Sequence, residues 1–194
     1  GHERLYHPGE VNFLRAQVLI INKLDSASPE AMDRLRASIA EMNPRAVVVQ
    51  TASRIYVDGG ERIRGKRVLV VEDGPTVTHG GMAYGAGALA ARQHGAAELV
   101  DPRPFAAGSL KSVFEAYPHL TQVLPAEGYF PEQLKDLEAT IQRTPCDLVL
   151  VATPIDLSRL IKIPQPVLRV SYRIEDWGEP TLKQVMEEFL RCQT

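Results

Sequence analysis

Short apolar runs alternate with longer segments of helical period along most of this chain, and no other feature limits its fold so strongly. The runs are rich in Val, Ile and Leu and are predicted to be strands at residues 17–22, 46–50, 67–71, 98–100, 121–124, 147–152 and 167–171. Strands that alternate with helices form mostly parallel sheets. The pattern therefore predicts an α/β fold with a mostly parallel sheet flanked by helices. The near-continuous hydrophobicity of the runs indicates burial on both faces.

The predicted helices begin at capping signals. Ser28 precedes Pro29, which places a capping hydroxyl before a proline at the first helical position. This helix is expected to span residues 29–42, and the others to span about 81–94, 108–116, 131–143 and 181–192. Residues 51–66 interrupt the rhythm, because a short strand-like run is followed by Asp58-Gly59-Gly60 and a cluster of charges. This segment is interpreted as a hairpin or linker.

Composition and charge narrow the classes of partner. The 194 residues contain 22 Lys and Arg against 24 Asp and Glu, a formal net charge of -2, so no overall positive field favours nucleic acid. The two cysteines, Cys146 and Cys192, are too few for a disulfide framework or a zinc cluster. No apolar run approaches the ~20 residues of a membrane span, and the first residues do not resemble a signal peptide. We expect a cytoplasmic protein that binds neither membrane nor nucleic acid.

The first strand runs directly into the tetrad Asn22-Lys23-Leu24-Asp25. The tetrad thus lies at the carboxyl end of a strand, which is where ligands bind in open α/β sheets. A carboxylate offers two acceptors in one plane, which match the N1–H and exocyclic amine of guanine, whereas adenine has no such donor pair. Lys23 is expected to lie over the base and Asn22 to brace neighbouring loops. The tetrad predicts recognition of guanine by Asp25.

A second base-binding segment follows at a suitable spacing. In GTP-binding proteins of the P-loop class, such a tetrad is followed by a helix, a strand and a Ser-Ala-x tripeptide whose backbone amide meets guanine O6. Here the helix from about Pro29 and the strand at 46–50 lead into Thr51-Ala52-Ser53. The predicted nucleotide-binding residues are therefore Asn22, Lys23, Asp25, Thr51, Ala52 and Ser53. The alternative is a surface turn, since Asn, Lys and Asp are common turn residues.

The chain lacks the Gly-x-x-x-x-Gly-Lys-Ser/Thr loop with which such a site holds phosphates and magnesium. The near-match at residues 60–67 ends in Arg67 instead of a hydroxyl residue, and it precedes a strand instead of opening a helix. The loop normally lies upstream of the tetrad, where about 21 residues are too few for it. A second near-match, to a dinucleotide fingerprint at residues 85–90, begins more than a dozen residues after its strand. Its small residues are expected to let a helix pack closely on the sheet.

The stretch from Glu72 to Met82 concentrates carboxylates, hydroxyls, a histidine and flexible backbone at the carboxyl end of the strand at 67–71. A helix beginning at Gly80 and Gly81 would present N–H groups and a dipole to a phosphate or carboxylate. The predicted anion-binding residues are Thr76, Thr78, Gly80, Gly81 and, after the next strand, Arg103. The predicted Mg2+ ligands are Glu72 and Asp73, and the predicted catalytic residues are Asp73 and His79. The alternative is a structural turn in which Thr78 caps the helix, with Arg103 in an exposed turn.

Several of these segments resemble a known family. Residues 1–3, 6–10, 21–25 and above all the long motif at 65–82 look like the cyclic 2,3-diphosphoglycerate synthetase family and its relatives among predicted P-loop GTPases, and residues 100–104 and 153–157 also fit. The resemblance covers essentially the whole chain and implies that it is a carboxyl-terminal portion. Residues 1–60 are then expected to end a P-loop NTPase-like domain, and residues 61–194 to form a further α/β domain with the glycine-rich anion-binding loop.

The resemblance implies an ATP-dependent closure of an intramolecular phosphoanhydride in 2,3-diphosphoglycerate, assisted by Mg2+. The tetrad favours guanine, so ATP and GTP both stay open. The leading hypothesis is a nucleotide-dependent phosphoryl-transfer enzyme, inactive as this chain alone because the phosphate loop is missing. Its partners would be a nucleotide and a small phosphorylated metabolite, with a missing amino-terminal region or a homo-oligomer left open. The alternatives are a regulatory module that binds GTP or a phosphometabolite without turnover and, more weakly, a dinucleotide-binding oxidoreductase.

Overall fold

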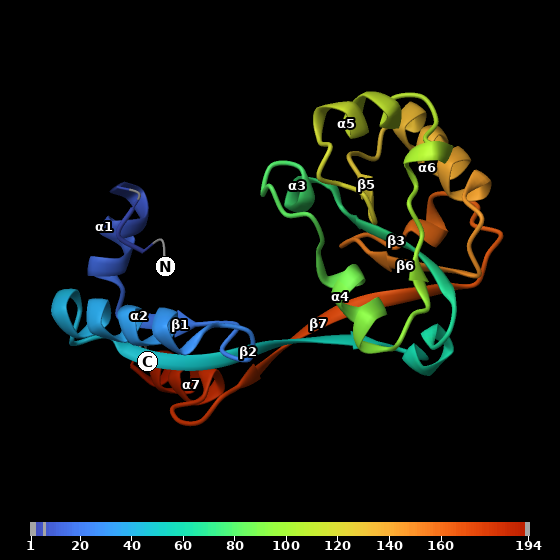
Figure 1. Ribbon diagram of the computed structural model, residues 1–194. Coiled ribbons are helices and arrows are strands. Elements are labelled where there is room, and N and C mark those ends of the chain that lie inside the picture. The colour runs from blue at the N-terminus through green and yellow to red at the C-terminus, as the bar shows by residue number, and fades with distance from the viewer. Residues whose placement is uncertain (1–2, 6, 193–194) are drawn as a thin grey trace. The chain divides into compact units, whose positions relative to one another are not determined.

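The computed structural model describes residues 3–5 and 7–192, whose path is shown in Figure 1. Gly1, His2 and Tyr6, which contribute to the family resemblance, lie outside the described residues. The helices are α1 (His7–Arg15), α2 (Pro29–Met42), α3 (Gly74–Val77), α4 (Ala86–Gln93), α5 (Leu110–Ala116), α6 (Pro131–Arg143) and α7 (Leu182–Arg191). The strands are β1 (Val18–Ile21), β2 (Val47–Val57), β3 (Arg67–Asp73), β4 (Glu98–Leu99), β5 (Leu124–Ala126), β6 (Leu148–Ala152) and β7 (Val167–Asp176). Short 3-10 helices are η1 (Gly60–Ile63), η2 (Arg103–Phe105) and η3 (Leu157–Arg159).

The strands form a mostly parallel sheet, which confirms the predicted fold class. Their order is β1-β2-β7-β6-β3-β4, and β5 also pairs with β3. β1 is parallel to β2, β3 is parallel to β4, β5 and β6, and β6 is parallel to β7. Parallel neighbours end at the same edge of a sheet. The carboxyl ends of β3 and β5 therefore lie together, with Asp73 in register with Ala126.

The chain divides into two compact units. The smaller unit contains residues 1–54 and 172–194, and the larger unit contains residues 55–171. The strands β2 and β7 each contribute residues to both units. The last helix, α7, thus belongs with the first strand and the tetrad in the smaller unit.

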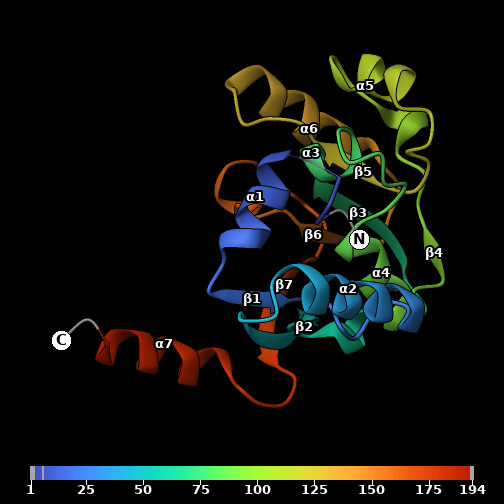
Figure 2. The ribbon, with the colours of Figure 1, turned by 90° about the vertical axis from the view of Figure 1, so that its left-hand side faces the viewer.

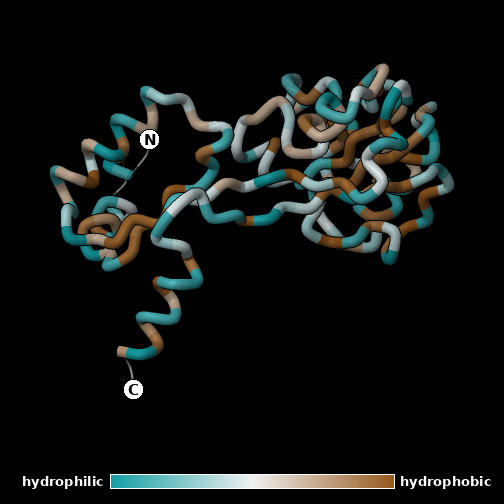
Figure 3. Tube along the Cα trace, turned by 90° about the horizontal axis from the view of Figure 1, so that it is seen from below, coloured by the Kyte–Doolittle hydropathy of each residue, from teal (hydrophilic) through white to brown (hydrophobic). Residues whose placement is uncertain are grey.

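The larger unit has an extensive hydrophobic core around β3 and β6. All five residues of β6 and five consecutive residues of β3, Val68 to Glu72, are buried. Figure 1 shows α4 on one face of these strands and α5 and α6 on the other, and Figure 3 shows hydrophobic segments inside this unit. Helices on both faces explain the unbroken apolar runs. The expected burial on both faces is confirmed for these two strands.

The smaller unit has a modest core on one face of β1 and β2, the face covered by α2 (Figure 2). Its buried hydrophobic cluster consists of Phe13, Ile21, Met32 and Ile39. Side chains alternate between the two faces of a strand, and on the opposite face Val18 and Ile20 are exposed. The expected burial on both faces is therefore wrong for β1.

Some predicted boundaries agree with the structure and others do not. Helices α2 and α6 have the predicted bounds, and α2 begins with Ser28 accepting a hydrogen bond from the Ala31 amide. β2 does not end at Gln50 but continues to Val57, so residues 51–53 lie inside a strand. Helix α4 begins at Ala86 instead of about residue 81, because residues 74–81 form the short helix α3 and a turn.

Candidate nucleotide and second-substrate sites

The structure brings the two predicted base-binding segments together in the smaller unit. Asn22 follows the last residue of β1, and its side-chain oxygen accepts hydrogen bonds from the Lys23 amide at 2.8 Å and the Thr51 hydroxyl at 3.0 Å. The Leu24 amide donates to the Thr51 carbonyl oxygen at 3.1 Å. Asn22 therefore braces the turn against β2, as its position in the tetrad predicts.

Lys23 and Asp25 of the tetrad are exposed, whereas Leu24 is half-buried against the core of the smaller unit. Lys23 has a φ of 64°, a left-handed conformation that is uncommon outside glycine and is often found at functional sites. The Asp25 carboxylate accepts a long hydrogen bond, 3.4 Å, from the Ser53 amide and is otherwise open to solvent. Thr51 and Ala52 are fully buried within β2. In this conformation Asp25 and Lys23 are the groups most able to meet a base, with Thr51 supporting Asn22.

In the larger unit, Glu72 at the end of β3 contacts the start of α4. Its carboxylate is buried and accepts hydrogen bonds from the backbone amides of Gly85 at 3.1 Å and Ala88 at 3.0 Å. Burial raises the pKa of Glu72, and these amides counteract part of the increase. The N-terminus of α4 thus holds an internal carboxylate, so Glu72 is poorly placed for the predicted magnesium role.

The same contact explains the dinucleotide-like glycines. A Cβ atom at Gly85 would lie 2.6 Å from Glu72 Oε2, and one at Gly87 would lie 2.6 Å from Val70 Cγ1. Both glycines are needed for close approach of α4 to β3. The amides that a dinucleotide phosphate would use are bonded to Glu72, which supports the packing interpretation of this fingerprint.

The loop after β3 is held by hydrogen bonds of its own. The Thr76 hydroxyl donates to the Asp73 carboxylate at 2.9 Å, and the Thr78 hydroxyl lies 2.9 Å from the Gly74 carbonyl oxygen and 3.0 Å from His79 Nδ1. The amides of Gly80 and Gly81 donate to the carbonyl oxygens of Pro75 and Thr78 at 3.1 and 3.3 Å. Neither glycine begins a helix, so an anion would have to displace these bonds to reach the two amides.

Sequence reasoning missed two residues of this site, Glu127 and Tyr129, which follow β5. Oε1 of Glu127 is buried and has no hydrogen-bond partner among the described residues. Burial raises the pKa of Glu127, the Asp73 charge adds to this, and Thr78 and His79 oppose it. Burial and the charge of Asp73 also raise the pKa of Tyr129. Their position in the sequence could have indicated them, because both residues follow a predicted strand and so lie at the same edge of the sheet as Asp73.

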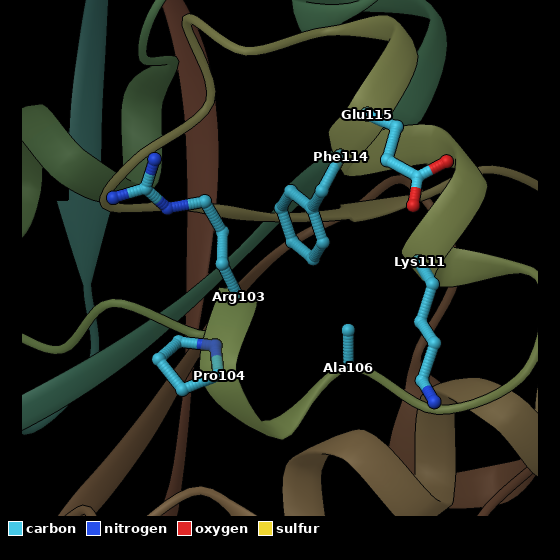
Figure 4. Close-up of a pocket in the computed structure, with 6 residues that line it drawn as sticks. All are labelled: Arg103, Pro104, Ala106, Lys111, Phe114 and Glu115. Carbon is cyan, nitrogen blue, oxygen red and sulfur yellow. The ribbon is translucent and has the colours of Figure 1, made fainter.

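Arg103, predicted as an anion clamp, is paired with a neighbouring carboxylate. Its guanidinium binds Asp101 through two nitrogens at 2.6 to 3.0 Å, which lowers the pKa of Asp101. Arg103 borders a pocket of about 330 Å3 with Lys111 and Phe114. Figure 4 shows its guanidinium directed away from Lys111 and Phe114. The hydrogen bonds and the ion pair of Arg103 thus engage Asp101, which is not part of the loop at residues 73–81.

Oxygen donors at the end of β3 suit a hard cation only in part. Asp73 and the Thr76 hydroxyl offer oxygen ligands of the kind that Mg2+ takes together with substrate phosphates. Within residues 3–5 and 7–192, no group of three or more His, Cys, Asp or Glu side chains has the arrangement of a protein metal site. A magnesium ion here would therefore depend on ligands from the substrate.

These features define an α/β protein with the predicted base-binding tetrad at the end of β1 and a polar, carboxylate-rich loop at the ends of β3 and β5. No protein-family model matches the chain. Over 191 residues it is 53% identical to a protein named arginine synthetase ArcE from Thermococcus kodakarensis. The match covers 98% of this chain but 43% of the relative. The chain is thus a homologue of part of a larger synthetase, and it spans less than half the relative's length.

No helix within the described residues is both long enough and apolar enough to cross a bilayer.

Proposed function

We propose that the chain supplies the base-binding end and the second-substrate site of a nucleotide-dependent synthetase whose phosphate-binding loop lies outside these residues. The hydrogen bond between Asn22 and Thr51 carries the proposal, because it joins two segments 29 positions apart into one turn with Asp25 at its rim. Homology to part of a synthetase supports the same class. Phosphoryl transfer needs positioning and charge neutralisation more than covalent help from the protein, so dividing these tasks among segments is chemically reasonable.

Guanine is the proposed base. The Asp25 carboxylate presents two acceptors to N1–H and the exocyclic amine, and the exposed Lys23 side chain can cover the ring. Mg2+ would be held by Asp73 and by phosphate oxygens, where it would neutralise developing charge. A regulatory module that binds nucleotide without turnover would use the same residues. In that case even the full-length protein would bind nucleotide and form no reaction product.

Changing Asp25 to Asn tests the base. Xanthine carries an oxygen where guanine carries the exocyclic amine, so the amide of Asp25→Asn pairs with xanthine and not with guanine. Isothermal titration of the chain and of the complete gene product should show GTP binding falling about tenfold or more and XTP binding rising. Asp33→Asn, an exposed carboxylate on α2, is the matched control. ATP binding as tight as GTP binding and unaffected by Asp25→Asn would contradict this proposal.

The second-substrate site favours a cation over the phosphorylated metabolite suggested by the family resemblance. Glu127 follows Ala126 of β5, the residue in register with Asp73 of β3. Burial, with an added contribution from the Asp73 charge, raises the pKa of Glu127. The amides that would hold an anion are bonded within the loop. The named relative is an arginine synthetase, and an arginine-like substrate or product carries a cationic group that pairs with carboxylates.

Titrations with a cationic and an anionic ligand test which charge the second substrate carries. Titration of the complete gene product with arginine and with 2,3-diphosphoglycerate should show arginine binding that weakens about tenfold in Glu127→Gln. Glu138→Gln, on α6, serves as control. Binding of 2,3-diphosphoglycerate that is unchanged or strengthened by Glu127→Gln, with no arginine binding, would restore the anion-binding interpretation of Thr76, Thr78, Gly80, Gly81 and Arg103.

A further inference from the structure

Thr78 follows the short helix α3, and its side chain connects that helix to His79 (Figure 1). Thr78 is buried, and its hydroxyl donates to the Gly74 carbonyl oxygen at 2.9 Å. Threonine often makes such a bond to the carbonyl four positions earlier in a helical turn. The same hydroxyl oxygen lies 3.0 Å from Nδ1 of His79. Thr78 therefore makes two side-chain hydrogen bonds with a single hydroxyl proton.

The single proton decides the direction of the second bond. A carbonyl oxygen can only accept a hydrogen bond, so the bond to Gly74 uses the proton of Thr78. The contact with His79 then requires a proton on Nδ1. The Glu127 carboxylate is a further acceptor near Thr78, since burial raises the pKa of Glu127 and a hydrogen bond with Thr78 opposes the increase. Among these neighbours of the hydroxyl, His79 is thus the one that can donate.

A proton on Nδ1 leaves a lone pair on Nε2 of a neutral histidine, because one ring nitrogen of neutral imidazole donates and the other accepts. His79 is exposed, and within residues 3–5 and 7–192 its Nε2 has no hydrogen-bond partner. Asp73 ends β3 and Glu127 follows β5 at the same edge of the sheet. The free groups at this edge are therefore acceptors, which suit a ligand rich in N–H donors.

We propose that Thr78 is a positioning residue that keeps the proton of His79 on Nδ1, so that Nε2 accepts an N–H group of a cationic second substrate and then acts as its base. The charge of that substrate rests on the proposed function. In the transfer the substrate N–H bond breaks, its electron pair stays on the substrate nitrogen, and the proton forms the Nε2–H bond. A cationic amine becomes a neutral nucleophile in this way.

The imidazolium that results is stabilised by the groups already described. Its Nδ1–H bond to Thr78 is unchanged by the transfer, because that nitrogen donates in both the neutral and the charged ring. The nearby Glu127 carboxylate stabilises the positive charge, since opposite charges favour each other's ionised forms.

Nitrogen-15 NMR of the complete gene product, labelled at histidine and free of ligand, measures the tautomer of His79. At alkaline pH, where imidazole is neutral, the protonated nitrogen and the lone-pair nitrogen have well-separated shifts. We expect the proton on Nδ1. Thr78→Val, which removes the hydroxyl, should lower the ratio of the Nδ1–H form to the Nε2–H form about fivefold to tenfold. Thr78→Ser keeps the hydroxyl and should keep the ratio.

His119 is the control in the same spectra. Its Nε2 lies 3.0 Å from the Val77 carbonyl oxygen, which can only accept, so His119 carries its proton on Nε2. This tautomer should be the same in every Thr78 variant if α3 keeps its position. A proton on Nε2 of His79 in the unmodified protein would overturn the proposal, and so would an unchanged His79 ratio in Thr78→Val.

Addition of arginine to the same samples tests the role of Nε2. The nitrogen-15 shift of Nε2 should change as arginine binds, and His79→Phe should weaken arginine binding about fivefold to tenfold. Bound arginine that leaves the Nε2 shift unchanged would overturn the acceptor role. The absence of arginine binding would instead contradict the proposed second substrate, whereas the ligand-free tautomer would still decide the role of Thr78.

Discussion

At the scale of single residues, partners decide which predicted roles are chemically available. Glu72 has the residue type of a metal ligand, yet its carboxylate is bonded to amides of α4. Arg103 has the residue type of an anion clamp, yet Asp101, two positions earlier, occupies its guanidinium. Asn22, by contrast, makes the bracing contact that its motif predicts. A motif that occurs in a fixed strand-and-turn context predicts the contacts of its residues. A residue type alone does not predict which group the side chain will contact.

The carboxylate of Asp147 provides a prediction at this scale. Hydrogen bonds from the guanidinium and then the backbone amide of Arg67, at 2.9 Å each, lower the pKa of Asp147 from 3.8 to about 2. In Arg67→Gln the pKa should rise towards 3.8, which a carbon-13 carboxyl titration by NMR would record. A folded-state pKa below the unfolded value stabilises the fold above about pH 4. This contribution is lost as the pH falls from about 4 towards 2. In Arg67→Gln the free energy of unfolding should therefore depend less steeply on pH over that range.

Lys66→Gln is the control for this titration, because Lys66 acts on Asp147 by charge alone. It should shift the Asp147 pKa less than Arg67→Gln does. Equal shifts in the two variants would mean that the local charge, and not the hydrogen bonds, sets the pKa.

At the scale of elements, local signals located helices better than the ends of strands. Pro29 and Pro131 mark the starts of α2 and α6, and both helices have the predicted bounds. The continuation of β2 through Thr51-Ala52-Ser53 was not predictable from neighbouring residues, because in the strand order it lies beside β7, which is more than 100 positions away in the chain. The late start of α4 has a similar cause, since its first turn is positioned by Glu72.

The packing of α4 on β3 leads to a prediction at the element scale. A Cβ atom at Gly87 would lie 2.6 Å from Val70 Cγ1, so Gly87→Ala should lower the free energy of unfolding by about 1–3 kcal/mol through overpacking. Val70→Ala removes the clashing atom. In that background the cost of Gly87→Ala should be smaller, a coupling that chemical denaturation of all four proteins measures. Strict additivity would show that the close approach is not what requires glycine.

At the scale of the whole molecule, the two units differ in how much core they contain. Among the described residues, the larger unit contains most of the buried hydrophobic side chains, including all of β6, whereas the main cluster of the smaller unit has four buried residues. The candidate sites are divided in the same way, with the tetrad in the smaller unit and the Asp73 loop in the larger. Composition and periodicity predicted the α/β class but not this division, because residues 172–194 return to the first unit only in three dimensions.

Two units with separate cores should unfold as separate cooperative units. Leu150→Ala, at a fully buried position of β6, should cost about 2–5 kcal/mol and accelerate exchange throughout β3, β5 and β6. Ile39→Ala, in the cluster of the smaller unit, should accelerate α2 and β1 and leave β6 unchanged. Native-state hydrogen exchange at increasing denaturant measures both. Acceleration of β6 by Ile39→Ala to the same extent as α2 would show one cooperative unit, in which β2 and β7 transmit the loss of either core to the other.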